Sequence, residues 1–143
     1  MFDNIRNFMQ SFLGVNNTQN RSRGYQSKSR NQMNYKLVPF DQAKEMIEKN
    51  SVVLIDVRTS NEYELMHVKN AINIPVGEIE QRILQVEQDR PIMVYCSSGA
   101  RSKTAIQVLN NLGYNNVYIW EYGSLATFPY KNMLVYGENG RII

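Results

Sequence analysis

The chain has 143 residues, 43% of them hydrophobic, which is enough for one domain with a proper core and a shorter additional segment. A single cysteine excludes an internal disulfide, and a single histidine argues against a zinc site built from Cys and His. The formal net charge is +3, but residues 1–34 carry five basic side chains against one acidic, so the remainder is slightly negative. The basic character therefore belongs to the N-terminal segment, and the rest of the chain is not expected to bind nucleic acid.

Residues 1–13 have apolar side chains at helical spacing with polar residues between them, which predicts an amphipathic stretch. Such a stretch can dock on its own domain, mediate self-association, bind a partner or contact a membrane surface, and these alternatives stay open. No apolar run approaches the about 20 residues of a membrane-spanning helix. The first residues also lack the continuous apolar core of a signal peptide, so the cytoplasm is the expected location.

Residues 14–34 are polar and rich in Asn, Gln, Ser and Arg, a composition typical of a flexible linker. The predicted division is therefore an N-terminal segment with its linker at 1–34 and a globular domain at 35–143. The positive charges of the linker favour anionic lipid or RNA only weakly, because no aromatic residue beyond Tyr25 supports base stacking.

The predicted domain begins with a strand at residues 35–38 and a helix from Asp41, as N-cap, to about residue 49. A β-branched run at 51–55 predicts a strand buried on both faces. The pattern Thr59–Glu62 then predicts a capping box that opens a short helix.

The second half of the domain continues the alternation. Strands are expected at 71–74, 91–95 and 117–120, helices at 76–86 and 102–112, and a closing turn or helix at 123–128. Alternating strands and helices imply right-handed crossovers and a mostly parallel sheet, in which ligands bind at the carboxyl ends of the strands. Asp56, Arg58 and Cys96 all follow such ends, so we expect them at one edge of the sheet.

The loop Cys96–Arg101 joins a buried strand to a helix. A loop at a helix N-terminus turns its backbone N–H groups inward and forms an anion-binding nest. The helix dipole and Arg101 favour the thiolate form of Cys96, which is the nucleophilic form. An inert buried cysteine is the alternative, but it explains neither the small residues of the loop nor the arginine.

Three motifs, in order and at the expected spacing, resemble the single-domain rhodanese sulfurtransferases. They are Leu54-Ile-Asp-Val-Arg58, His67-Val-Lys-Asn-Ala-Ile-Asn-Ile-Pro75 and Tyr95-Cys-Ser-Ser-Gly-Ala-Arg-Ser102. The resemblance covers roughly residues 35–130 and implies an α/β fold with a central, mostly parallel five-stranded sheet and helices on both faces. It departs from the family at Lys69-Asn70, where Pro-Gly is usual, and at Tyr122-Gly123, near a usual Gly-Gly.

The resemblance implies catalytic roles for Cys96 and Arg101. The substrate-binding residues would be Ser97, Ser98, Gly99, Ala100, Ser102 and Arg58. For Arg101 the expected role is to steady the loop and favour an anion, or to form a salt bridge with a carboxylate of the domain, and both can hold.

Other residues at this edge have competing interpretations. Asp56 is expected to give structural support by accepting N–H groups at its strand end, rather than to act as acid or base. Arg58 is expected either to contact a substrate anion or to form a surface ion pair. His67 is expected to be a hydrogen-bonded structural residue rather than a base for Cys96.

The activity that the resemblance implies is sulfur transfer through a Cys96 persulfide, with no metal or organic cofactor. The donor would be a small sulfur-containing anion such as thiosulfate, a polysulfide, or a persulfide, including a protein persulfide; the acceptor would be a thiol. Ser97 and Ser98 occupy positions that are often basic in thiosulfate-preferring members, so a persulfide, polysulfide or donor protein is as consistent as thiosulfate. The alternatives are a Cys-dependent phosphatase or arsenate reductase, and a non-catalytic rhodanese-like binding module.

Overall fold

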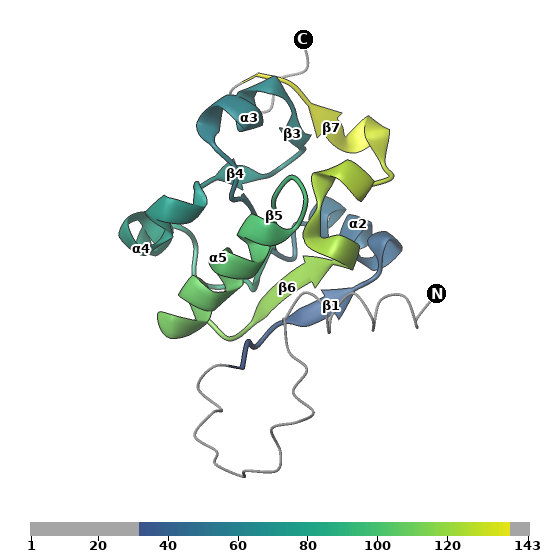
Figure 1. Ribbon diagram of the computed structural model, residues 1–143. Helices are drawn as coiled ribbons and strands as arrows, with labels where there is room; N and C mark the ends of the chain where they lie inside the picture. The colour runs from purple at the N-terminus through teal and green to yellow at the C-terminus, as the bar shows by residue number, and fades with distance from the viewer. Residues whose placement is uncertain (1–31, 138–143) are drawn as a thin grey trace, which may run out of the picture.

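The computed structural model describes residues 32–137, which form a three-layer α/β domain around one parallel sheet (Figure 1). The strands of this sheet lie in the order β1-β6-β5-β2-β4, and every neighbouring pair is parallel. Their bounds are Lys36–Val38 for β1, Val53–Asp56 for β2, Ile72–Asn73 for β4, Ile92–Tyr95 for β5 and Val117–Trp120 for β6. The predicted five-stranded parallel sheet is confirmed.

The two faces of the sheet follow from the alternation of side chains along each strand. In β5, Ile92 and Val94 contribute to one hydrophobic cluster, whereas Met93 and Tyr95 contribute to the other. Helices α4 (Ile79–Arg82) and α5 (Ala100–Asn111) cover the first face, and α2 (Phe40–Glu48) covers the second. Because both faces are covered, every residue of the central strands β2 and β5 is buried, as the run at 51–55 predicted for β2.

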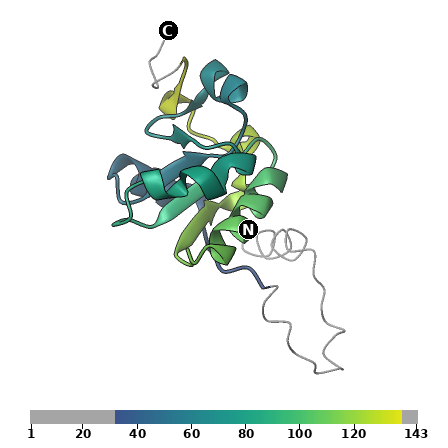
Figure 2. The ribbon, with the colours of Figure 1, turned by 90° about the vertical axis from the view of Figure 1, so that its left-hand side faces the viewer.

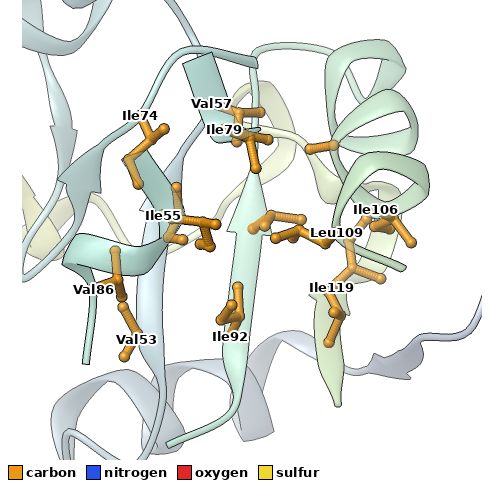
Figure 3. Close-up of a cluster of buried hydrophobic side chains, with 14 of the residues drawn as sticks. Val53, Ile55, Val57, Ile74, Ile79, Val86, Ile92, Ile106, Leu109 and Ile119 are labelled. Atoms are coloured by element: carbon orange, nitrogen blue, oxygen red, sulfur yellow. The ribbon is translucent and has the colours of Figure 1, made fainter. Parts of the chain in front are cut away.

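Branched aliphatic side chains dominate the cluster beneath α4 and α5. Figure 3 shows Ile55 and Ile92 of the sheet on the same side as Ile106 of α5. Full burial of one such side chain stabilises the fold by about 1.5–3 kcal/mol. This packing fixes the start of α5 relative to the end of β5, and so fixes the loop between them.

A second, two-stranded antiparallel sheet lies at one end of the domain beside α3 (Ser60–Leu65) (Figure 2). It consists of β3 (His67–Val68) and β7 (Leu134–Val135). The sequence did not predict this pair, because two residues are too few to show a periodicity. Residues 32–137 also contain short 3-10 turns: η3 (Val76–Glu78), η4 (Ile83–Gln85), η5 (Glu121–Gly123), η6 (Leu125–Thr127) and η7 (Lys131–Met133).

Several predicted helix details need correction. Helix α2 begins at Phe40 after Pro39, which makes no side-chain cap, so Asp41 lies in the first turn instead of at the N-cap. The helix expected at 76–86 is divided into η3, α4 and η4. Helix α5 begins at Ala100 instead of Ser102. The capping box that opens α3 is confirmed, with Thr59 as N-cap.

Two of the departures from the family pattern occur where the backbone is left-handed. Asn70 has φ 74°, and Tyr122 and Gly123 have φ 67° and 54°. Asn tolerates this conformation better than most residues, which explains how the turn at Lys69-Asn70 dispenses with glycine. Tyr122 is the strained case, and it lies next to the candidate site described below.

The predicted amphipathic stretch at residues 1–13 and most of the predicted linker lie outside the described residues. Within the described part, Met33 packs against the first cluster and the Asn34 backbone N–H donates to Asn110 Oδ1 at 2.7 Å. Ordered contacts therefore begin slightly before Tyr35. None of the helices in the described range is long and apolar enough to cross a membrane.

Candidate active site

Cys96 directly follows β5 and lies at the carboxyl edge of the sheet, as predicted. Its side chain is completely buried, and Sγ accepts two backbone hydrogen bonds, from Gly99 N–H at 3.0 Å and from Ser102 N–H at 3.3 Å. Gly99 is the N-cap of α5 and Ser102 is in its first turn. The sulfur therefore satisfies N–H groups that a helix start leaves unpaired.

Gly99 makes this arrangement possible for two independent reasons. Its φ is 110°, a conformation that side chains with a Cβ rarely adopt. A Cβ added there would also lie 2.7 Å from the carbonyl oxygen of Tyr122. The glycine thus lets the loop turn its N–H toward Sγ while the Tyr122 backbone passes close behind it.

The segment after β6, residues 123–125, packs against the Cys96–Arg101 loop and forms one wall of the site. The Cys96 N–H donates to Gly123 O at 3.2 Å, and the Leu125 N–H donates to Cys96 O at 2.8 Å. The Ser124 hydroxyl donates to Ser97 O at 2.6 Å. These bonds hold both backbone groups of Cys96, so the position of the sulfur depends on the turn at Gly123 and Ser124.

Ser102 contributes through its backbone and not through its hydroxyl. The hydroxyl is fully buried and donates to Gly123 O at 3.1 Å, which ties α5 to the wall. The substrate-binding role expected of Ser102 stays a prediction, and its backbone N–H is the group that is directed at Sγ. Ser98 and Ala100 are exposed and Ser97 is half-buried, so these three predicted residues form the solvent-facing side of the loop, which we call the mouth.

Arg101 forms a two-pronged ion pair with Glu62 of α3. Nη1 lies 2.7 Å from Oε1, and Nη2 lies 3.0 Å from Oε2. The same carboxylate accepts the Ser97 hydroxyl at 3.3 Å and, through the capping box, the N–H and hydroxyl of Thr59. The salt bridge that the sequence offered as one alternative for Arg101 is thus present.

The charge of Glu62 is held firmly. Hydrogen bonds from Arg101 hold the pKa of its carboxyl well below the ordinary value, although partial burial acts in the opposite direction. The Arg101 pKa is raised by the same partner. Both side chains are about one third exposed, at 34% and 35%, so this pair lies at the border between protein and solvent.

The second ion pair at this edge joins Asp56 to Arg58 and is buried. Asp56 is fully buried and Arg58 is 5% exposed, and their Oδ2 and Nη2 atoms are 2.7 Å apart. Asp56 also accepts the Arg58 backbone N–H at 2.9 Å, which is the structural support expected of it. Arg58 donates further to Met66 O at 2.6 Å. The ion pair expected as one alternative for Arg58 is present, but it lies in the interior instead of at the surface, and this position does not favour a substrate contact.

His67 is a structural residue, as expected. Its ring is buried, stacks on Tyr63 at 3.6 Å between centroids, and donates from Nδ1 to Tyr63 O at 2.7 Å. Burial lowers its pKa, so the ring is neutral at pH 7. Tyr95 completes this region, because its hydroxyl accepts the Val68 N–H at 3.0 Å.

Sequence reasoning missed three contributors to the site: Glu62, Gly123 and Ser124. Glu62 was assigned only to the capping box, and no local pattern shows that its carboxylate also reaches a loop 39 residues away. The available signal was the lone arginine at the end of the loop, which needed a carboxylate partner. Gly123 and Ser124 act through backbone and hydroxyl contacts that sequence spacing does not reveal.

Comparison with known proteins agrees with this geometry. A family model described as the rhodanese-like domain matches residues 39–126, which is more than half of the chain. Thiosulfate sulfurtransferase GlpE of Coxiella burnetii is 30% identical over 86 residues, covering 60% of this chain and 80% of that protein. Thiosulfate sulfurtransferase PspE of Escherichia coli is 40% identical over 65 residues, covering 44% of this chain and 62% of that protein.

Solved structures show the same likeness. A rhodanese from E. coli, solved with anions, superposes with a TM-score of 0.52 at 33% identity and covers 59% of this chain and 98% of its own. A rhodanese-related protein from Thermoplasma volcanium superposes with a TM-score of 0.57 at 30% identity and covers 66% of this chain and 90% of its own.

Proposed function

The chain belongs to the rhodanese-like domain family, and from that premise we propose that it is a sulfurtransferase that carries a sulfane sulfur on Cys96. The observation that carries the proposal is the pair of backbone N–H groups, from Gly99 and Ser102, directed at Sγ. They stabilise the thiolate before the reaction. After the reaction, the same N–H groups can stabilise the terminal sulfur of the Cys96 persulfide, which then carries the negative charge.

The proposed cycle has two displacements at sulfur. In the first, Cys96 thiolate attacks the outer sulfur of a donor, a new S–S bond forms, and the donor's own S–S bond breaks with its electron pair on the leaving group. In the second, an acceptor thiolate, or cyanide in an assay, attacks that outer sulfur and releases Cys96 as thiolate. These steps need no metal or organic cofactor, because sulfur is both nucleophile and cargo.

Glu62 and Arg101 act in this proposal by holding the loop. Their ion pair joins the end of the loop to α3, and the Ser97 contact joins its beginning to the same carboxylate. Ser98 and Ala100 lie at the exposed mouth, where a donor enters. We also propose that the protein acts in the cytoplasm. The proposed acceptor of the sulfur is a thiol.

The main alternative, phosphoryl transfer, is disfavoured by the spacing and by the partner of Arg101. Four residues separate Cys96 from Arg101, one fewer than in the related phosphatase loops, so the ring of N–H groups is smaller. A phosphoryl group needs donors about 2.7–3.1 Å from each of its oxygens. Both terminal nitrogens of Arg101 already bind Glu62. A non-catalytic module is disfavoured because it needs no polarised, buried thiol.

Steady-state kinetics test the proposal. Sulfur transfer from thiosulfate or a persulfide to cyanide should give parallel double-reciprocal lines, the signature of a ping-pong cycle. Cys96→Ser should abolish the rate, and hydrolysis of an aryl phosphate by the unchanged protein should be slow. Insertion of a glycine after Ser98 should weaken sulfur transfer. Rapid aryl phosphate hydrolysis with no detectable thiocyanate would replace this proposal with the phosphatase alternative.

A further inference from the structure

Glu62 is placed to do more than hold the loop. Its carboxylate bonds to both ends of the Cys96–Arg101 loop, through Ser97 at 3.3 Å and Arg101 at 2.7 Å. The sulfur beneath the loop is fully buried, whereas Glu62 is about one third exposed. A donor approaching from solvent therefore passes the Glu62 carboxylate and its partner Arg101 before it reaches Cys96.

The charge balance at the mouth follows from these contacts. Between Cys96 and Ser102 the only charged side chain is Arg101, and both of its terminal nitrogens bind Glu62. The neighbouring Asp56–Arg58 pair is also internally balanced. The loop thus offers hydroxyls and backbone dipoles, and the one cation between Cys96 and Ser102 is paired with Glu62.

We propose that Glu62 selects the sulfur donor by charge, favouring persulfides that carry at most one negative charge over the thiosulfate dianion. The inference rests on the proposed sulfurtransferase function and names the substrate class of the same site. Glu62 acts here as a specificity-determining residue and takes no part in bond formation.

The two donors place different demands on the mouth. With thiosulfate, the bond between its two sulfurs breaks and sulfite leaves with the electron pair, so two negative charges must be accommodated beside Glu62. With a protonated persulfide, the outer sulfur passes to Cys96 with its proton, and the departing thiolate carries a single charge. Only the first donor needs Arg101 as a counter-charge, and Glu62 competes for that arginine.

The substitution Glu62→Gln isolates the charge. Gln also completes a capping box, so α3 keeps its start, and its amide can still accept from Arg101. Two control variants match it: Glu64→Gln removes the same charge from the same helix away from the loop, and Thr59→Ala weakens the cap while keeping the Glu62 charge. Glu62→Ser provides a second neutral variant in case the first folds poorly.

The measurement is the ratio of kcat/KM for thiosulfate to kcat/KM for the persulfide of 2-mercaptoethanol, with cyanide as acceptor. A ratio cancels any difference in the folded fraction. Both neutral variants should raise it by about tenfold, the effect of removing one nearby like charge at intermediate dielectric, while both controls leave it unchanged. The rate of Cys96 alkylation by iodoacetate relative to neutral iodoacetamide should rise in the same variants.

The outcomes separate the inference from the function. Transfer from both donors with the ratio unchanged in Glu62→Gln and Glu62→Ser would overturn the inference and leave the sulfurtransferase standing. An equal rise in Thr59→Ala would also overturn it, since the effect would then come from loosening α3. No transfer from any donor by the unchanged protein would overturn the function and the inference with it.

Discussion

Two ion pairs lie at the same edge of the sheet and each joins a carboxylate to an arginine, yet they differ in burial, in sequence separation and in the elements that supply them. Asp56 and Arg58 are two residues apart, buried, and bonded within one strand end and its turn. Glu62 and Arg101 come from different elements and are about one third exposed. The first pair is part of the interior, whereas the second faces solvent beside the Cys96 loop.

The difference shows that residue type and strand position do not assign a function at this edge. Arg58 follows a strand end just as Cys96 does, but it turns inward to Asp56 and Met66 O. Burial decides how costly each pair is to disturb, because a buried charge that loses its partner cannot be compensated by water. The predictions below use this contrast, from the largest effect to the smallest.

The buried pair should dominate stability. Asp56→Asn leaves the Arg58 charge inside the protein without its counter-charge, and the free energy of unfolding should fall by about 3–5 kcal/mol. Glu62→Gln removes a partly exposed charge, and its cost should be about 0–1 kcal/mol. Urea unfolding of both variants checks this. Equal losses in the two variants would contradict the distinction between an interior pair and a mouth pair.

Gly99→Ala should damage the loop more than the fold. The added Cβ meets the Tyr122 carbonyl at 2.7 Å, in a backbone conformation with φ 110°. We expect a loss of about 1–3 kcal/mol in unfolding free energy. Because an error of about 1 Å in the position of Cys96 can cost about 10²-fold in rate, kcat/KM should fall by that order. Gly113→Ala, also at positive φ but with open space around its Cβ, is the matched control and should keep its activity.

The dependence of stability on pH separates the two regions again. The folded-state pKa of His67 is lowered from 6.5 by burial, so the unfolded chain binds this proton more readily and stability falls as pH drops below about 6.5. Glu62 has a lowered pKa, so its contribution is complete above the ordinary carboxyl range and is lost only in strong acid. Urea unfolding between pH 7 and 5 should show a decline that His67→Gln removes. A decline that persists in this variant would assign it to other groups.

Removal of residues 1–31 should have the smallest effect on either region. A chain that begins at Gln32 keeps the Met33 contact with the core and the Asn34 bonds to α5. We expect its kcat/KM to match that of the full chain, while liposome sedimentation or light scattering of the full chain reports membrane contact or self-association. Loss of transfer in the shorter chain would move the predicted domain boundary toward the N-terminus.

The order of strands and helices could be predicted from the sequence because apolar runs and a capping box mark these elements locally. The apolar runs at 51–55 and 91–95 and the capping box at Thr59 each depend on neighbours in the chain. Contacts between residues far apart in the sequence could not be predicted from local patterns. The Glu62–Arg101 pair, the support of Cys96 by Gly123 and the inward turn of Arg58 all depend on packing that local periodicity does not describe.

Intact-mass spectrometry of the reduced protein after exposure to a persulfide or thiosulfate tests the central proposal most directly. The proposal predicts that the unchanged protein gains the mass of one sulfur atom, that cyanide removes it with release of thiocyanate, and that Cys96→Ser gains nothing. Because the chain has a single cysteine, the gain can be assigned to Cys96 without ambiguity. An unchanged mass with every donor, or the same gain in Cys96→Ser, would contradict the assignment of Cys96 as the sulfur carrier.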